Sequence, residues 1–155
     1  MQTIAQSAGD SVACVGVFCN QFGHQTNEND DDILNTLKHV RPGNGFVFAG
    51  DLYAKVNVNG AASHPLFQWM RKTIRFPMDP EGDTKGNGVD DVDALILSRG
   101  GFDGSTVATW APVSRNDIAW NFEKFLFDKD GNLVKRYSRF YATEKIQADI
   151  DALLA

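Results

Sequence analysis

The amino-acid sequence predicts an α/β fold for this chain of 155 residues. Three observations indicate it: a continuous apolar run at 12–18, apolar residues at spacings of three and four after residue 32, and the dipeptide Asp130-Gly131 between strand-like segments. At 43% hydrophobic, the chain is long enough for one domain with a sizeable core, and too short for two ordinary ones. We therefore expect a single domain over 1–155.

The first expected strand, Val12 to Phe18, is apolar throughout instead of alternating, as in strands buried on both faces of a parallel sheet. It ends in a polar loop that reaches Gln25. Aspartates at 30–32 then favour the start of a helix, because carboxylates stabilise the positive end of the helix dipole. The apolar face expected for this helix comprises Ile33, Leu34, Leu37 and Val40.

A second helix is expected after Ser63, which is a plausible N-cap in front of His64-Pro65. The segment 75–109 is interrupted by many Gly, Pro and Asp residues, with room for only a short helix at 92–97. Because few ordered elements fit within it, we interpret 75–109 as one long surface insertion and not as a linker between domains.

The last third of the chain predicts a hairpin and a helix. Strands at 120–127 and 132–137 flank Asp130-Gly131, and Asp-Gly between two strands is a strong hairpin signal. Thr143 is expected to cap a final helix. The side chains expected to face the core from this helix are Ile146, Ile150, Leu153 and Leu154.

Composition argues against several classes of function. The formal net charge is −5, whereas nucleic acids and anionic membranes require clustered Lys and Arg. No apolar run approaches the roughly 18 residues needed to span a bilayer. Residues 1–10 lack the basic start and apolar centre of a signal peptide, and two cysteines five positions apart give no disulfide framework. We expect a cytoplasmic protein with no nucleic-acid or membrane partner.

No metal site is predicted. The three histidines, His24, His39 and His64, are too dispersed to indicate one. The acidic runs at 79–83 and 90–93 lack the glycine and terminal glutamate of a calcium-binding EF-hand loop. We interpret them as a solvated part of the insertion.

Two segments carry most of the chemistry: Val15 to Gln25 (VGVFCNQFGHQ) and Trp120 to Phe125 (WNFEKF). With several other segments they resemble the glutathione peroxidase family in order along the chain, from about Val12 to Leu154. The other matching segments are 34–43, 58–60, 64–67, 112–119, 136–139 and 149–154. The Arg41-Pro42-Gly43 loop and the long stretch before Trp110 are similar to the tetrameric, glutathione-using branch of that family.

The resemblance implies a thioredoxin-like fold, in which helices flank a central mixed sheet, with the first strands of that sheet missing from this chain. It also places the family's nucleophile, a selenocysteine or cysteine, before Val12, where this sequence has no cysteine. We therefore expect the chain to be N-terminally shortened. The resemblance implies no cofactor other than glutathione as the reducing co-substrate.

Gln25, Trp120 and Asn121 match the positions that surround the nucleophile in the family. Each can donate a hydrogen bond, and such donors lower the pKa of a thiol or selenol and stabilise a developing negative charge on oxygen. Taken as residues alone, Trp120 could equally be a core aromatic, and Gln25 and Asn121 ordinary polar groups of a loop and a strand end.

Arg41 and Arg139 match positions that receive the carboxylates of glutathione in the tetrameric branch. A guanidinium suits that task because it pairs with a carboxylate through two parallel hydrogen bonds. A surface salt bridge is the alternative interpretation. This chain has Phe140 where the family often has a second arginine, and Phe18 where it usually has proline.

Neither cysteine is expected to replace the missing nucleophile. Cys14 lies within the apolar run, where burial raises the pKa of a thiol. Cys19 is expected to be more exposed, but it matches a family cysteine that does not react with peroxide. The expected function is reduction of hydrogen peroxide or organic hydroperoxides by glutathione in the oxidative-stress response. The alternative is a non-catalytic binding or interaction protein on the same scaffold.

Overall fold

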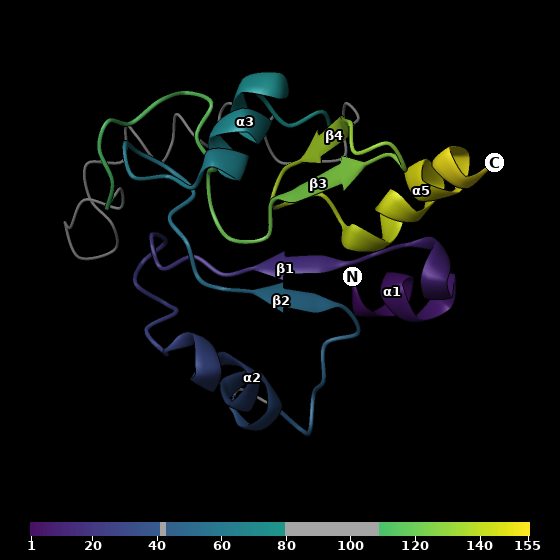
Figure 1. Ribbon diagram of the computed structural model, residues 1–155, viewed down its shortest axis with the longest axis horizontal. Helices are drawn as coiled ribbons and strands as arrows, with labels where there is room; N and C mark the ends of the chain where they lie inside the picture. Colours follow the sequence, from purple (N-terminus) through teal and green to yellow (C-terminus); the bar gives the residue numbers. More distant parts are fainter. Residues whose placement is uncertain (41–42, 80–108) are drawn as a thin grey trace.

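The computed structural model describes residues 1–40, 43–79 and 109–155, and it confirms the α/β fold class (Figure 1). In chain order the elements are α1 (Gln2–Ala8), η1 (Gly9–Ser11), β1 (Val15–Val17), α2 (Asp30–His39), β2 (Asp51–Tyr53), α3 (Pro65–Thr73), β3 (Lys124–Phe127), β4 (Leu133–Tyr137), η2 (Thr143–Ile146) and α5 (Gln147–Leu154). Both η elements are 3₁₀ helices. Residues 80–108 of the expected insertion, including the short helix at 92–97, lie outside the described residues.

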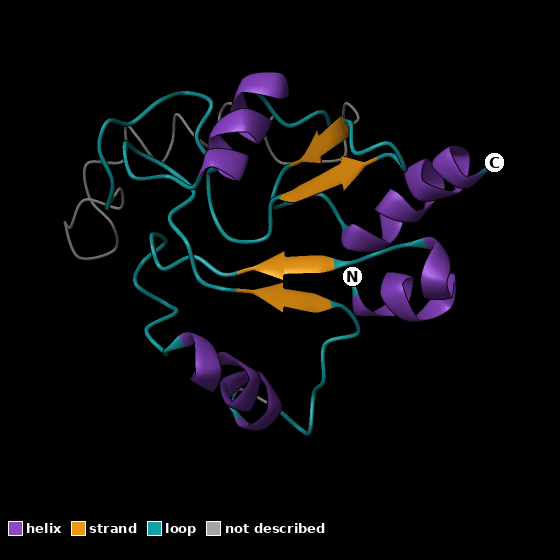
Figure 2. Cartoon of the chain, in the orientation of Figure 1, coloured by secondary structure: helices purple, strands orange, loops and turns teal. Residues whose placement is uncertain are grey.

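Parallel and antiparallel strand pairs are both present, as two separate two-stranded sheets within the described ranges (Figure 2). β1 and β2 are parallel, with Val15 opposite Asp51 and Val17 opposite Tyr53, and α2 lies between them in sequence. β3 and β4 form an antiparallel hairpin with an irregularity between Leu126 and Phe127.

β1 is shorter and less buried than the apolar run predicts. It covers Val15–Val17, and the side chain of Val15 is 51% exposed. Among the described residues β1 pairs with β2 alone, so only part of the strand is covered. Val17 packs against the core, which keeps the start of the following loop fixed.

The first long helix forms where the three aspartates predict it, directly after Asn29. Its expected apolar face is only partly buried. Ile33 is 6% exposed, whereas Leu34 and Val40 are more than half exposed.

The N-cap of α3 is His64 and not Ser63. The ring Nδ1 of His64 accepts a hydrogen bond from the backbone N–H of Leu66, and Pro65 takes the first helical position. The Ser63 hydroxyl is used elsewhere, because it donates to the carbonyl of Gly60 and accepts from Arg71.

Strand β3 begins four residues later than the sequence predicts, at Lys124, so residues 120–123 form a turn. The final helical segment begins as η2, and Ala142, not Thr143, stands at its N-cap without a side-chain hydrogen bond. Ile146 and Ile150 face the core as expected, whereas Leu153 and Leu154 are 43% and 54% exposed.

Two hydrophobic clusters form the core. One joins the loop after β1 to α3 and the hairpin through Cys19, Phe22, Val58, Phe67, Met70, Ile118 and Leu133. The other joins α1 to β4 and the C-terminal helix through Ile4, Tyr137, Tyr141, Ile146 and Ile150. Part-buried Trp120, one of the residues that the sequence singles out, packs against the first cluster.

Candidate active site

The loop after β1 and the turn before β3 meet at Gln25 and Asn121. The side-chain Nδ2 of Asn121 donates a hydrogen bond to Oε1 of Gln25 over 3.1 Å. Because Oε1 is used in this way, the Nε2 group of Gln25 is oriented as a donor toward other partners. The structure thus brings together two residues that the sequence identifies from separate segments.

Trp120 lies beside the same pair. Its ring is half-buried and packs on Phe22, with the ring centroids 5.6 Å apart. Gly23 fits between the two loops: a Cβ there would lie 3.7 Å from Cη2 of Trp120 and 3.6 Å from Cγ of Gln25. Gly23 also has φ of +65°, a conformation that favours glycine. Among the described residues, no hydrogen-bond acceptor contacts the indole N–H of Trp120.

Arg139 also lies next to Trp120. Arg41 lies outside the described residues. The guanidinium carbon of Arg139 is 5.8 Å from the centre of the Trp120 ring and 4.3 Å from that of Phe140. Both distances are in the range of cation–π contacts. Of the five residues that the sequence singles out, Gln25, Asn121 and Arg139 therefore lie around a fourth, Trp120.

Both loops contain a non-glycine residue with positive φ next to a candidate residue. His24 (φ 50°) precedes Gln25, and Phe122 (φ 68°) follows Asn121. Such conformations are uncommon and persist where surrounding contacts enforce them, which is frequent at functional sites. The side chain of Phe122 is 82% exposed, so packing of its ring does not explain its conformation.

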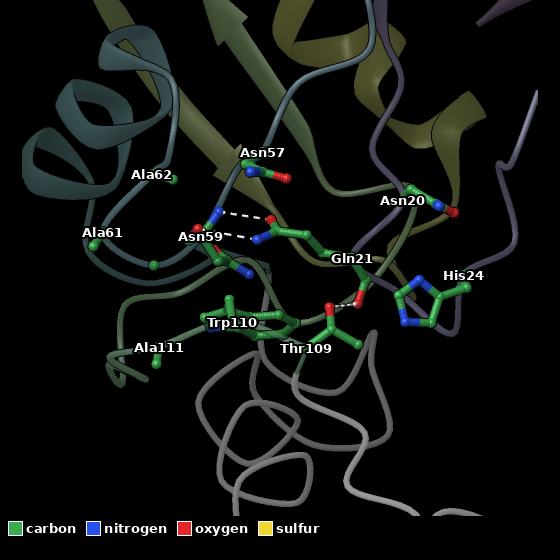
Figure 3. A pocket seen from close by; sticks show the side chains of 11 residues that line it. Asn20, Gln21, His24, Asn57, Asn59, Ala61, Ala62, Thr109, Trp110 and Ala111 are labelled. Carbon is green, nitrogen blue, oxygen red and sulfur yellow. Dashed lines mark hydrogen bonds between the residues drawn. The ribbon is translucent and has the colours of Figure 1, made fainter. Parts of the chain in front are cut away.

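Two buried amides enforce this arrangement by joining the loops. Oε1 of Gln21 accepts from the backbone N–H group of Val58. It also accepts from the N–H of Asn59, and Nε2 of Gln21 donates to the carbonyl of Asn59 (Figure 3). The Asn59 side chain then donates to the carbonyl of Ile118 and accepts from its N–H, at 2.8 and 2.9 Å. The connection from Gln21 through Asn59 to Ile118 fixes the distance between the loops that carry Gln25 and Trp120.

A pocket of about 410 Å³ adjoins these amides (Figure 3). Its described lining contains both polar and apolar groups and no Asp, Glu, Lys or Arg: it comprises Asn20, Gln21, His24, Asn57, Asn59, Gly60, Ala61, Ala62, Thr109, Trp110 and Ala111. The Thr109 hydroxyl donates to the backbone carbonyl of Gln21 over 2.9 Å. Gln25, Trp120 and Asn121 are not among the described residues that line this pocket.

Two buried charged side chains, Glu123 and Arg136, fix the turn that carries Trp120 and Asn121. Oε1 of Glu123 accepts from the N–H of Ala119, while its Oε2 pairs with Nε of Arg136 over 2.7 Å. Arg136 is fully buried and also donates to the carbonyls of Asn116 and Asp117. Because a buried ion pair tolerates little displacement, Glu123 and Arg136 fix the path of the backbone from 116 to 123.

A second buried pair fixes the start of the same segment. The carboxylate of Asp117 is paired with Arg71 of α3, and its other oxygen accepts from the indole N–H of Trp110 and the N–H of Ser114, each at 2.8 Å. Asp117 is 1% exposed. Its hydrogen bonds compensate for the burial of its charge.

Both cysteines are buried, so Cys19, which was expected to be more exposed than Cys14, is hardly more accessible. Cys14 and Cys19 are 5% and 8% exposed, and burial raises the pKa of both thiols. The Sγ of Cys19 also donates to Oε1 of Gln21 at 3.4 Å. Both are therefore poor nucleophiles at neutral pH, because the thiolate is the reactive form.

Within the described ranges, no three His, Cys, Asp or Glu side chains gather closely enough to hold a metal ion. None of the described helices has the length and apolar character needed to cross a membrane.

Sequence reasoning missed the residues that hold the site together, chiefly Gln21, Asn59, Asp117 and Glu123. Three of them are polar side chains less than 8% exposed, and the carboxylate of Glu123 is 2% exposed. A signal was present, because all four lie inside the segments that carry the family resemblance. Hydrophobic periodicity does not identify buried polar groups, so their partners became visible only in the fold.

Comparison with known proteins identifies relatives over most of the chain. A family model described as glutathione peroxidase matches residues 2–71. Glutathione peroxidase 1 of Hylobates lar is 45% identical over 141 residues, which are 91% of this chain and 62% of that protein. A glutathione peroxidase of Molluscum contagiosum virus subtype 1 is 46% identical over 140 residues, which are 90% of this chain and 56% of the viral protein.

Among solved structures, the crystal structure of Trgpx in apo form matches 99% of this chain and 64% of that chain, with a TM-score of 0.52 and 25% sequence identity. The chain thus spans about three-fifths of the length of these relatives.

Proposed function

This chain belongs to the glutathione peroxidase family, and we propose that the protein containing it reduces hydrogen peroxide or organic hydroperoxides at the expense of glutathione. The observation that carries the proposal is the meeting of Gln25, Trp120 and Asn121. Three side chains with N–H donors converge from two loops that are joined through buried amides and ion pairs.

In the proposed reaction a selenolate or thiolate attacks one oxygen of the peroxide and the O–O bond breaks. The departing hydroxide or alkoxide takes up a proton and leaves as water or alcohol, while the nucleophile becomes a selenenic or sulfenic acid. Two glutathione thiols then reduce this acid, which yields water and glutathione disulfide. The donors of Gln25, Trp120 and Asn121 stabilise the anionic nucleophile and the negative charge on the departing oxygen.

We assign the nucleophile to neither cysteine of this chain. Burial and a raised pKa argue against both Cys14 and Cys19. The resemblance places a selenocysteine or cysteine before Val12, and we propose that such a residue faces Gln25, Trp120 and Asn121.

Arg139 is the proposed contact for a glutathione carboxylate, with Arg41 as the second. The position of Arg139 over Trp120 supports this role, because a carboxylate bound there lies next to the proposed reaction centre. Phe140 stacks against the guanidinium and restricts its orientation. A tetramer in the cytoplasm is part of the same proposal. The tetramer rests on the likeness of the Arg41-Pro42-Gly43 loop and of the long stretch before Trp110 to the tetrameric branch.

The test is a coupled glutathione assay on protein made from the longest reading frame that contains this chain, with hydrogen peroxide as the oxidant. We expect turnover that falls about 100-fold to 1,000-fold when Trp120 is replaced by Phe, because a single lost oxyanion donor has an effect of this size. An in-frame UGA or cysteine codon upstream of Met1 would identify the nucleophile.

Absence of glutathione-dependent peroxide consumption by that protein would contradict the proposal. It would favour the non-catalytic binding protein on the same scaffold.

A further inference from the structure

Lys124, the first residue of β3, donates to three backbone carbonyls of one turn. Its Nζ lies 2.9 Å from the carbonyl oxygen of Ser138, 3.5 Å from that of Arg139 and 2.7 Å from that of Tyr141. An ammonium carries three N–H donors and no acceptor, so these three carbonyls match its capacity. Lys124 is half-buried, and burial lowers the pKa of its ammonium.

The turn held in this way carries Arg139. It is fixed a second time at its start, where the N–H of Ser138 donates to Oδ1 of Asp79 over 2.9 Å. Within the turn, the N–H of Phe140 donates to the Ser138 hydroxyl. The turn is thus anchored on both sides, and the one long cationic side chain that leaves it extends over the ring of Trp120.

We propose that Lys124 is a positioning residue that sets the guanidinium of Arg139 over Trp120, where a carboxylate of the thiol co-substrate binds. The carboxylate role of Arg139 rests on the proposed function above, whereas the placement of Arg139 by Lys124 rests on these contacts alone. Lys124 acts through the backbone of the turn and does not itself contact the co-substrate.

The position of Lys124 directly after Glu123 in the chain supports this assignment. Its neighbour Glu123 fixes the turn that carries Trp120 and Asn121, and Lys124 fixes the turn that carries Arg139. Glu123 ends the turn and Lys124 begins β3, so two adjacent residues hold the two halves of the site. Their relative position is therefore set within two residues of the sequence.

The experiment compares Lys124→Met with Lys135→Met. Lys135 is also a half-buried lysine of the same hairpin, but it pairs with Asp149 and not with the Arg139 turn. The first readout is the NMR chemical shift of the Nε–H group of Arg139, which the rings of Trp120 and Phe140 displace from its ordinary position. We expect Lys124→Met to abolish most of this displacement, Lys135→Met to keep it, and Lys124→Arg to restore part of it.

The second readout is affinity for glutathione relative to glutathione diethyl ester, whose carboxylates are masked. We expect Lys124→Met to lower the preference for free glutathione roughly tenfold, the factor that corresponds to about 1.4 kcal/mol. Lys135→Met should lower thermal stability and leave this preference unchanged. This difference between the two variants distinguishes a positioning role of Lys124 from a general contribution to stability.

An unchanged Arg139 shift in folded Lys124→Met would overturn the assignment. If that variant does not form the hairpin, Lys124→Gln tests the assignment in its place. The glutamine amide supplies two N–H donors without the charge, so the Arg139 shift should lie between those of wild type and of a variant without donors. Failure of the wild-type chain to bind glutathione would contradict the carboxylate role of Arg139, while the NMR shift would still decide the role of Lys124.

Discussion

Asn121 and Gln25 are 96 positions apart in the sequence, yet the amide of one donates directly to the amide of the other over 3.1 Å. This bond orients both side chains. It commits the oxygen of Gln25 to Asn121 and leaves its N–H₂ group as a donor. A pair of amides is therefore set to donate hydrogen bonds at the point where the two loops meet.

We predict that Asn121→Asp lowers the peroxidase rate of the longer protein, the one made from the longest reading frame that contains this chain. The expected decrease is about 100-fold or more, because loss of an oxyanion donor has an effect of this size. The new carboxylate cannot donate, and it binds the Gln25 N–H₂ group, which withdraws a second donor. The measurement is glutathione-coupled consumption of hydrogen peroxide. Asn20→Asp is the matched control, since its oxygen still accepts from the N–H of Thr26. Equal rates for both variants would contradict a role for this amide pair.

Trp120→Phe and Trp110→Phe should separate catalysis from stability. The indole N–H of Trp110 bonds to buried Asp117, so its loss should cost about 1–3 kcal/mol of unfolding free energy. Trp120 keeps most of its packing on Phe22 when replaced by Phe, so the expected effect is on the rate. Urea unfolding measures the free energy of unfolding, and the glutathione-coupled assay measures the peroxidase rate. An unchanged rate in Trp120→Phe would show that this ring only packs.

We predict negligible peroxidase turnover for the 155-residue chain, because both of its thiols are buried with raised pKa values. Iodoacetamide should modify Cys14 and Cys19 slowly in the native protein and rapidly in urea. Replacing Cys19 by Ser should leave the activity of the longer protein unchanged. Robust turnover by the short chain that Cys19→Ser abolishes would make Cys19 the nucleophile.

Acid should destabilise the contact between β4 and α5. Burial opposes ionisation of Asp149, but hydrogen bonds from Lys135 and Tyr137 outweigh it and lower the pKa of this carboxyl below its ordinary value of 3.8. A group whose pKa is lowered on folding stabilises the protein above its ordinary pKa and loses that contribution as pH falls through the folded value. Stability should therefore fall below about pH 4, and less steeply in Asp149→Asn.

The readout is the urea midpoint measured between neutral pH and the acid limit. Asp151→Asn on the same helix is the control, because the carboxylate of Asp151 accepts a hydrogen bond from the exposed side chain of Gln147. Parallel acid profiles for wild type and Asp149→Asn would contradict the assignment.

Asn59→Ala should lower the free energy of unfolding by about 2–4 kcal/mol, because it leaves the N–H and the carbonyl of buried Ile118 without partners. Asn27→Ala removes amide contacts at an exposed position and should change stability by less than about 1 kcal/mol. Urea unfolding at neutral pH tests both. Similar small losses in the two variants would show that the connection from Asn59 to Ile118 is weak.

The sequence allowed prediction of features that depend on local chemistry. The aspartates before Ile33 predicted α2, and Asp130-Gly131 predicted the hairpin, since each depends on a few adjacent residues. The sequence predicted a strand over 120–127, whereas residues 120–123 form a turn. It is a turn because Glu123 accepts from Ala119 and Phe122 has positive φ, and neither contact nor dihedral is encoded in a hydrophobic pattern.

The candidate site was predicted only through the resemblance. Gln25, Trp120, Asn121 and Arg139 are neighbours in the fold, but the physics that brings them together lies in long-range contacts such as Gln21 to Asn59. Side-chain periodicity reports which face of an element is buried, and it contains no information on partners nearly 40 positions away. The exposure of Leu153 shows the same limit at a helix end, where an apolar residue faces solvent.

The cluster of Ile4, Tyr137, Tyr141, Ile146 and Ile150 also governs the order in which the chain can fold. Ile4 is synthesised long before its partners in this cluster, the earliest of which is Tyr137. During translation α1 therefore remains without its native cover until β4, η2 and α5 have been made, although β1, β2 and α2 can already associate locally. Until then the apolar face of α1 is a natural site for chaperone binding.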